Sequence, residues 1–469
     1  MLLTLGEVQN LEGSDRGASG AGDVPVARET FLRAARAARD AGSPILLARA
    51  ALGYSGIGVA GMGGALEGAL LAEALSALPV GDSSLRVRVL GRLVEARWWL
   101  AVRWAVDVPE SWQAWVDELQ NLAEEAVAMA RRIGEPSGVI AALSSRVIVA
   151  TGPVAAERYL AVSREQIALA EQLGTHSSVL LAYHWWFLAA AQQGEIASSD
   201  NADQQLAALV TTYRITFFEW LVAVQRVARA LRDGRLSDAE EGIADAERIW
   251  PNSAVALQQL FTLRREQGRA VELTRRVLEA HARDPVATPW IIIDLLIRLE
   301  SGSVRGVRET LRTLVNQWIE RPAAAEWLRS MSWLVEAVVA VDDGESAATL
   351  YPVLVPFVNV NLVMGTSDLA GGSVAHYLGL LARTIGHLST AEVHFEEARQ
   401  HNARWGNRIY LAHSSVELAD LLAERDGEAE RERARELLDT AEGLAVEIGL
   451  VTLGQRCRAL RERLTRPAR

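Results

Sequence analysis

The sequence predicts an all-α protein, a right-handed α-solenoid built from repeated helical hairpins. Alanine, leucine, arginine and glutamate dominate long windows, and only 13 of the 469 residues are proline, a composition that favours helix. Helical runs alternate with short turns that contain glycine. Small and apolar residues recur at constant distances from these glycines. The same hairpin unit is therefore expected many times along the chain.

The repeated unit is clearest in three segments, 221–251, 261–285 and 375–406. After the turn glycines Gly234, Gly268 and Gly386, small or apolar residues occupy the fifth, ninth and twelfth positions. These are Ala239, Ile243 and Ala246; Leu273, Val277 and Ala280; and Ala391, Phe395 and Ala398. The spacing places them on one stripe of the second helix, where alanine lets a neighbouring helix approach closely. A hairpin cannot cover such a stripe alone, so we expect the copies to stack.

This pattern resembles the tetratricopeptide repeat (TPR) family. The resemblance rests on the glycine turn, the A-x-x-x-[FIVL]-x-x-A stripe and the prolines that follow it, Pro251 and Pro285. Gly234 and Gly268 are separated by 268 − 234 = 34 residues, as that family's repeat requires. The stripe recurs at 27–34 and 434–441. The resemblance implies one TPR-like array over 1–469, more regular at about 221–285 and 375–450, with irregular hairpins at about 45–120 and 287–370.

A narrower similarity extends over most of the chain. The order of "LLARAALGY", "LFTLRREQGR", "GSVAHYLGLLARTIGHLSTAEVHFEEA" and "ERARELLDTAEGLAVEIGL" is similar to the C-terminal helical arm of bacterial signal-transduction ATPases (STAND), including LuxR-type and cyclase-linked transcriptional regulators. The chain has no P-loop, no Walker B context and no terminal helix-turn-helix, and Met1 falls inside the first repeat helix. It therefore reads like the arm alone, as a truncated or separately encoded piece.

That resemblance implies a non-catalytic sensor or protein-interaction arm. A protein partner or small effector would bind its concave surface, and an ATPase module would belong to the full-length regulator. The alternative is a free-standing TPR scaffold that binds peptide segments of other proteins. A P-loop encoded in frame upstream of Met1 would favour the regulator arm over the scaffold.

Composition excludes several kinds of site. All 48 basic residues are arginine, which excludes a Walker A lysine and a Schiff-base lysine. The net charge of −11 disfavours direct nucleic-acid binding. The single cysteine, Cys457, cannot form an internal disulfide, and no apolar run is long enough for a membrane span. We expect a cytoplasmic protein with no cofactor.

The stretch "SGIGVAGMGG" raises the least favoured function, a dinucleotide-binding enzyme. Gly56, Gly58 and Gly61 match G-x-G-x-x-G, and Asp82 follows at the distance of the ribose-binding acid. That site needs a strand on each side of the glycines, whereas the sequence on both sides has helical spacing. We therefore predict an irregular turn between helices.

Tryptophan and histidine supply the candidate binding residues: Trp98, Trp99, His184, Trp185 and Trp186. Adjacent residues on a helix point about 100° apart, so one member of each pair would face the core and the other could line the concave surface. Aromatic rings with a polar N–H suit sugars, peptides or a partner helix. The alternative is that all five residues pack between hairpins.

Two further polar groups are predicted to be structural. His387, His394 and His401 recur every seven residues, too far apart to share a metal ion, and are expected on a solvated helix face. The proline-containing run 351–363 is expected to bend between hairpins, and the stretch "PFVNVNLVMGTSD" carries Asn359, Asn361 and Ser367 in an apolar setting. Their side chains are predicted to satisfy the loop backbone, with ligand orientation as the alternative.

Overall fold

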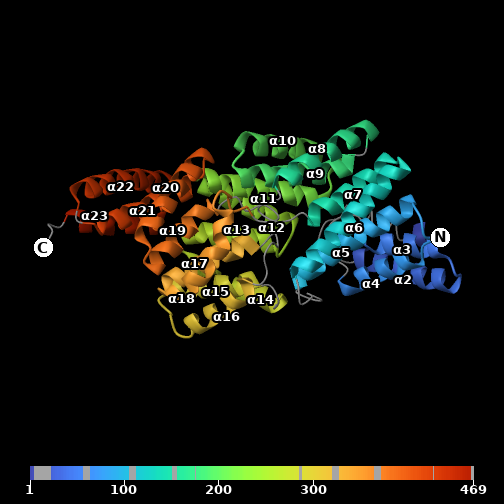
Figure 1. Ribbon diagram of the computed structural model, residues 1–469, viewed down its shortest axis with the longest axis horizontal. Coiled ribbons are helices and arrows are strands. Elements are labelled where there is room, and N and C mark those ends of the chain that lie inside the picture. The colour runs from blue at the N-terminus through green and yellow to red at the C-terminus, as the bar shows by residue number, and fades with distance from the viewer. Residues whose placement is uncertain are drawn as a thin grey trace. The chain divides into compact units, whose positions relative to one another are not determined.

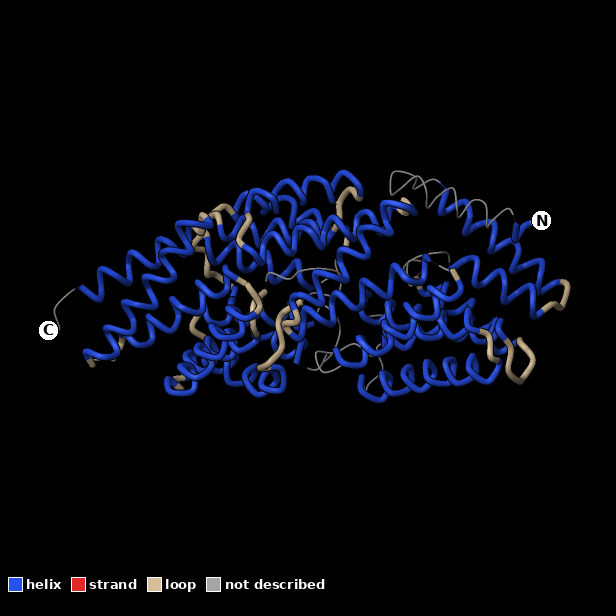
Figure 2. The backbone as a smooth tube through the Cα atoms, turned by 90° about the horizontal axis from the view of Figure 1, so that it is seen from above, coloured by secondary structure: helices blue, strands red, loops and turns tan. Residues whose placement is uncertain are grey.

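The computed structural model describes residues 1–4, 23–55, 64–104, 112–149, 156–174, 176–284, 288–319, 327–363, 371–425 and 427–465. These residues are helical apart from short connections, as Figures 1 and 2 show. Within the described ranges the only strand-like pairing is an isolated antiparallel bridge between Asn361 and Ser373. The all-α prediction is confirmed. No helix in the described part of the chain combines the length and apolarity needed to cross a bilayer.

The chain divides into two compact units. The first comprises Met1–Ala189, Asp200–Val222 and Ile249–Pro251, and the second comprises Ala190–Ser199, Ala223–Arg248 and Asn252–Arg469. The single array over 1–469 expected from the sequence stays a prediction.

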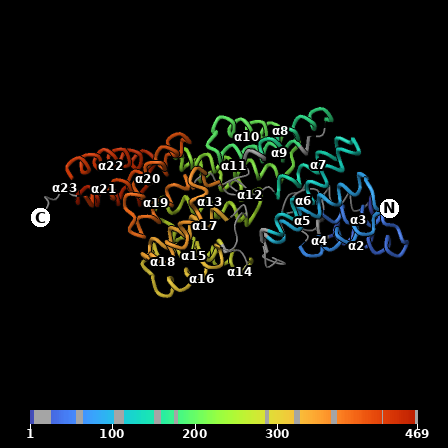
Figure 3. The backbone as a smooth tube through the Cα atoms, in the orientation of Figure 1, coloured from blue at the N-terminus to red at the C-terminus, as the bar shows by residue number. Residues whose placement is uncertain are grey.

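The first unit contains helices that pack on their sequence neighbours and, for α3 with α5 and α5 with α7, on the next but one. This is the contact pattern of stacked hairpins, and the chain can be followed through it in Figure 3. The helices are α2 (Asp23–Asp40), α3 (Pro44–Ser55), α4 (Ala65–Ala77), α5 (Ser84–Trp104), α6 (Trp112–Ile133), α7 (Pro136–Val149) and α8 (Ala156–Leu173), followed by parts of α9 (His176–Gln193), α10 (Ile196–Tyr213) and α11 (Thr216–Asp233).

The second unit continues the pattern, with contacts between α15 and α17, α17 and α19, and α21 and α23. Its helices are α12 (Leu236–Ile249), α13 (Ala254–Glu266), the 3-10 turn η2 (Ala270–Leu273), α14 (Thr274–Arg283), α15 (Thr288–Glu300), α16 (Val307–Ile319), α17 (Trp327–Ala340), α18 (Gly344–Leu354), η3 (Val355–Phe357), α19 (Val374–Ile385), α20 (Leu388–Arg404), α21 (Arg408–Ala423), α22 (Glu428–Ile448) and α23 (Val451–Thr465).

The predicted hairpin stripe forms the core. All fifteen stripe positions named above or contained in 27–34 and 434–441 are buried, and Ala239, Ala246, Ala391 and Phe395 are fully so. The turn glycine Gly386 adopts φ 93°, a left-handed conformation that L side chains rarely adopt. The TPR-like character of the hairpins is thereby confirmed.

The run 351–363 differs from the predicted bend. Pro352 lies inside α18, and the chain becomes extended only after η3. The buried Asn361 side chain donates a hydrogen bond to the Ala191 carbonyl (3.3 Å), and its backbone N–H donates to the Gln192 carbonyl (3.0 Å). Asn361 thus satisfies backbone carbonyls, as predicted, but they belong to the last turn of α9 and not to the loop; Ser367 lies outside the described residues.

Candidate functional site

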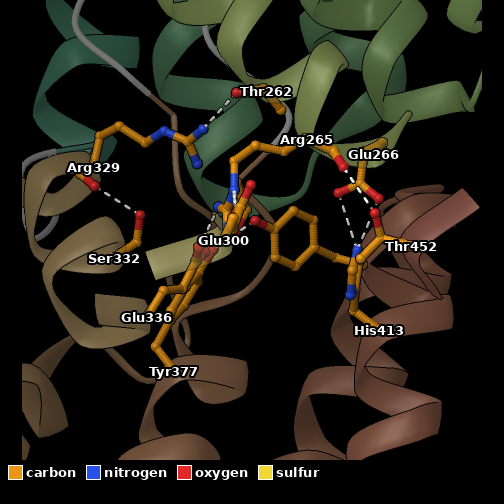
Figure 4. Close-up of polar contacts among 12 residues, drawn as sticks. Thr262, Arg265, Glu266, Glu300, Arg329, Ser332, Glu336, Tyr377, His413 and Thr452 are labelled. Carbon is orange, nitrogen blue, oxygen red and sulfur yellow. Dashed lines mark hydrogen bonds and ion pairs between the residues drawn. The ribbon is translucent and has the colours of Figure 1, made fainter. Parts of the chain in front are cut away.

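A cluster of polar side chains lies among the first helices of successive hairpins in the second unit (Figure 4). It joins residues from α13, α15, α17, α19, α21 and α23. The three residues that α17 contributes, at positions 329, 332 and 336, are spaced so that they lie on one face of the helix. We call this set the polar cluster: Thr262, Arg265, Glu266, Glu300, Arg329, Ser332, Glu336, Tyr377, His413 and Thr452.

Arg265 joins three helices of the cluster. Its Nε donates to Glu300 Oε1 on α15 (2.6 Å), and its Nη1 donates to Glu336 on α17. The guanidinium also lies 5.5 Å from the centre of the Phe261 ring. Burial is the largest single influence on the pKa of Glu336 and raises it, but the charge and hydrogen bond of Arg265, together with the charge of Arg329, hold that pKa below its ordinary value. Both groups are therefore charged at neutral pH.

Arg329 lies on the same face of α17 and is 2 % exposed. Its Nη2 donates to the Thr262 hydroxyl on α13 (2.9 Å), and the guanidinium stacks 4.3 Å from the centre of the Trp333 ring. A guanidinium over an indole face is favourable, more so when water is excluded. Arg329 thus fixes α17 against α13 with a charge buried at the contact.

Two contacts join α13 to the C-terminal helices. His413 Nε2 on α21 donates to the Glu266 carboxylate (3.0 and 3.1 Å), and the Thr452 hydroxyl on α23 donates to the Arg265 carbonyl (3.2 Å). The pairs are separated by 147 and 187 residues. These contacts depend on tertiary structure alone.

A hydroxyl and imidazole group borders the cluster on α19 and α21. The Tyr377 hydroxyl donates to the Gly371 carbonyl (2.7 Å) and is hydrogen-bonded to the Tyr410 hydroxyl (2.9 Å). His376 Nδ1 lies 3.1 Å from the Ser414 hydroxyl. Burial lowers the pKa of His376 to about 4, against the opposing charge of Glu417. His376 is therefore a neutral buried imidazole near pH 7.

The cluster is held together by ion pairs and by hydrogen bonds in which a charged group takes part, the stronger kind of hydrogen bond. In the described part of the chain, no group of three or more His, Cys, Asp or Glu side chains is arranged to hold a metal ion.

The five residues predicted from the sequence lie in the first unit. Trp98 is fully buried and stacks on Trp115, with ring centres 5.9 Å apart. His184 and Trp185 are also buried, and burial lowers the pKa of His184 to about 3. The side chain of Trp99 lies outside the described residues.

Trp186 alone of the described four is half-buried rather than buried. Tyr183 stacks on it (6.3 Å between ring centres), and the Arg164 guanidinium lies 5.3 Å from its ring centre. Of the tryptophan pair in α9, Trp185 therefore packs in the core and Trp186 reaches the surface, the division expected from the helical angle. A binding role for these residues stays a prediction.

The contacts around the glycine-rich stretch disfavour a dinucleotide site, although its glycines at 56–63 lie outside the described residues. Helix α3, not a strand, precedes them and ends at Ser55. The buried Glu67, in the first turn of α4, accepts a hydrogen bond from Ser55 and so places a carboxylate where a phosphate would bind. Arg132 donates two hydrogen bonds to the Asp82 carboxylate, from Nε to Oδ2 (2.7 Å) and from Nη2 to Oδ1 (3.0 Å).

The prediction of a solvated histidine face is correct only for His387, which is exposed. His394 is hydrogen-bonded to the Tyr351 hydroxyl (2.9 Å) and His401 to the Ser373 hydroxyl (3.2 Å). His394 therefore contacts α18, and His401 contacts the residue that caps the start of α19. A seven-residue period cannot tell solvent from a polar neighbour of this kind.

Sequence reasoning missed the polar cluster. The residues of each helix stand in ordinary amphipathic patterns, where a charged side chain is expected to face water. A signal was present in α17, where Arg329, Ser332 and Glu336 interrupt a face that would otherwise be apolar. The partners that justify those charges lie on other helices, so the signal had no interpretation without the fold.

Comparison with known proteins adds little. No protein-family model and no curated protein matches the chain. One similar solved structure is "Structure of Naa15/Naa10 bound to HypK-THB", with 10 % sequence identity and a TM-score of 0.23, covering 98 % of this chain and 89 % of that chain. A likeness at this TM-score carries no argument, so the TPR-like description rests on the hairpins themselves.

Proposed function

We propose that the protein is a non-catalytic, TPR-like interaction arm. The observation that carries this is the polar cluster: successive hairpins place charged and aromatic groups from six helices together. Stacked repeats typically recognise partners in this way, because each repeat contributes one or two side chains to a shared surface. In this proposal, a charged group of the protein partner replaces one member of an ion pair such as Arg265–Glu300. The side chains of that pair are 25 % and 38 % exposed.

The finer proposal is the sensor arm of a signal-transduction ATPase of the STAND type, coupled to transcription or cyclase activity. Its support is the sequence similarity described above. In this role, an effector or partner shifts the population of arm conformations, and the ATPase module of the full-length regulator responds. The upstream reading frame then encodes a P-loop, whereas a free-standing scaffold lacks one.

The test begins with the ligand. A thermal-shift screen of metabolites and oligosaccharides on the full chain, followed by tryptophan-fluorescence titration of any hit, measures effector binding. Glu300→Gln keeps the side-chain shape and removes one charge of the cluster, and Glu279→Gln is its control on a peripheral pair. Loss of a response in Glu300→Gln alone supports the cluster as the site. An equal response in both variants rejects it, and no hit at all favours a purely protein-binding scaffold.

A further inference from the structure

The second unit has a contact that a simple stack of hairpins lacks. In such a stack each hairpin touches only its neighbours. Here α13, near the start of the unit, contacts α23, its last helix. The unit therefore closes on itself through residues far apart in the sequence.

Glycines at two turns permit this approach. A Cβ added at Gly234, the turn before α12, would lie 2.8 Å from Ile448 Cδ1 at the end of α22. A Cβ at Gly268, the turn after α13, would lie 3.4 Å from the Thr452 hydroxyl. Both glycines have positive φ, which ends their helices, and both also leave space for the C-terminal helices.

Polar contacts complete the junction. His413 donates to Glu266, and Thr452 donates to the Arg265 carbonyl, as described above. The His413 and Glu266 side chains are 22 % and 11 % exposed, so water has access to the pair. We call these contacts, with the Gly234–Ile448 approach, the closure.

The closure is separable from the folding of the hairpins. The buried stripes that hold each hairpin together, such as Ala434, Leu438 and Ala441 in α22, are distinct from the closure residues. The contacts of the closure are the two hydrogen bonds and the approach of Ile448, Val451 and Thr452 to the turn glycines, and none of these three residues is a stripe position. Local openings of this kind require much less free energy than global unfolding.

We propose that the closure is a reversible latch: α13 and the turn before α12 separate from α21, α22 and α23, which stay intact as helices, and the polar cluster is reached by a partner in the open state. The statement that a partner reaches the polar cluster in the open state rests on the proposed function. The opening itself does not, because it is measured without a partner.

The test uses the full chain with Glu241→Cys and Gln455→Cys, two exposed positions on α12 and α23, labelled with a donor and acceptor pair. The native Cys457 is fully buried, and burial raises the pKa of its thiol to about 11, so it stays unlabelled while the fold is intact. Energy transfer between the two labels reports the separation of α12 from α23.

The decisive comparison is between two glycine variants. Gly234→Ala and Gly302→Ala both place a side chain at positive φ in a hairpin turn, but a Cβ at Gly302 has nothing within 4 Å. We expect energy transfer to fall in Gly234→Ala only, with unchanged helical circular dichroism. Adding Ile448→Ala to Gly234→Ala removes the colliding atoms and should restore transfer.

Two results would overturn the latch. One is equal transfer in Gly234→Ala and Gly302→Ala. The other is a fall in transfer accompanied by equally faster labelling of Cys457, which shows that α23 detaches or unfolds rather than moving as an intact helix. If the latch opens as expected and no partner binds the open form, the proposed function fails and the latch remains.

Discussion

His413 and Glu266 are 147 residues apart in the sequence, and their side chains are 3.0 Å apart in the structure. The imidazole belongs to α21 and the carboxylate to α13, so this pair is one of the contacts that form the closure of the second unit. Neither residue belongs to the hydrophobic core of a hairpin. The contribution of this pair to stability can therefore be measured separately from that of helix packing.

Replacing His413 tests this pair in solution. A hydrogen bond to a charged group contributes about 1.5–3 kcal/mol, and the partial exposure of both side chains places this pair near the lower value. We therefore expect His413→Ala to lower the free energy of unfolding of the second unit by about 1.5 kcal/mol, measured by urea denaturation. The control is His387→Ala, at an exposed position. Equal effects of the two changes would show that the pair contributes nothing.

Two helical glycines should respond oppositely to alanine. A Cβ at Gly379 on α19 would lie 2.5 Å from the Phe395 ring, whereas a Cβ at Gly443 on α22 meets nothing within 4 Å. Gly443→Ala should stabilise the chain by roughly 0.5–1 kcal/mol through helix propensity. Gly379→Ala should destabilise it by about 1–3 kcal/mol, because overpacking exceeds that gain. Thermal unfolding of both variants measures the difference, and a shared sign would contradict the packing described here.

The Arg265–Glu336 pair should matter more than a surface pair of the same kind. Glu336→Gln leaves the Arg265 guanidinium with Glu300 as its remaining carboxylate. Breaking a buried pair costs about 3–5 kcal/mol, and the retained Glu300 contact should reduce this to about 2 kcal/mol. Glu279→Gln, whose partner Arg275 is 88 % exposed, should change stability by less than about 0.5 kcal/mol. Urea denaturation distinguishes the two, and indistinguishable midpoints would refute the argument.

Acid should destabilise the protein first through two buried histidines. Burial lowers the pKa of His184 to about 3 and of His376 to about 4, while the unfolded chain titrates near 6.5. Between these values the unfolded state binds more protons, so stability is complete above pH 6.5 and falls as the pH decreases. The carboxylates Glu336 and Glu417, whose pKa values are held low by arginine neighbours, add to the loss only below about pH 4.5.

The pH window between 6.5 and 5 therefore isolates the histidines. Each should remove roughly 1.5 kcal/mol of stability over that interval. His376→Gln keeps a polar group near Ser414 and cannot titrate, so its stability should depend less steeply on pH, measured by denaturation at stepped pH. His387→Gln is the control at an exposed site, and its profile should match the unmodified chain. A His376→Gln profile as steep as that of the unmodified chain would show that His376 is already protonated in the fold.

Local patterns predicted the hairpins well because their causes are local. Gly386 ends a helix in the left-handed region, and Ala391, Phe395 and Ala398 face one neighbour because 3.6 residues complete a turn. The candidate tryptophans were harder to interpret. Helix geometry separates Trp185 from Trp186 by about 100° but does not say which of them meets the core.

The sequence by itself determined the class of fold, the hairpin stripe and the turns, and it excluded sites that require lysine or paired cysteines. The tertiary structure alone decided where the charges gather. Arg265, His413 and Thr452 belong to three helices, and each occupies an ordinary polar position in the pattern of its own helix. Periodicity describes one helix at a time, whereas an ion pair or a closing contact depends on the distance between helices that only the packed chain establishes.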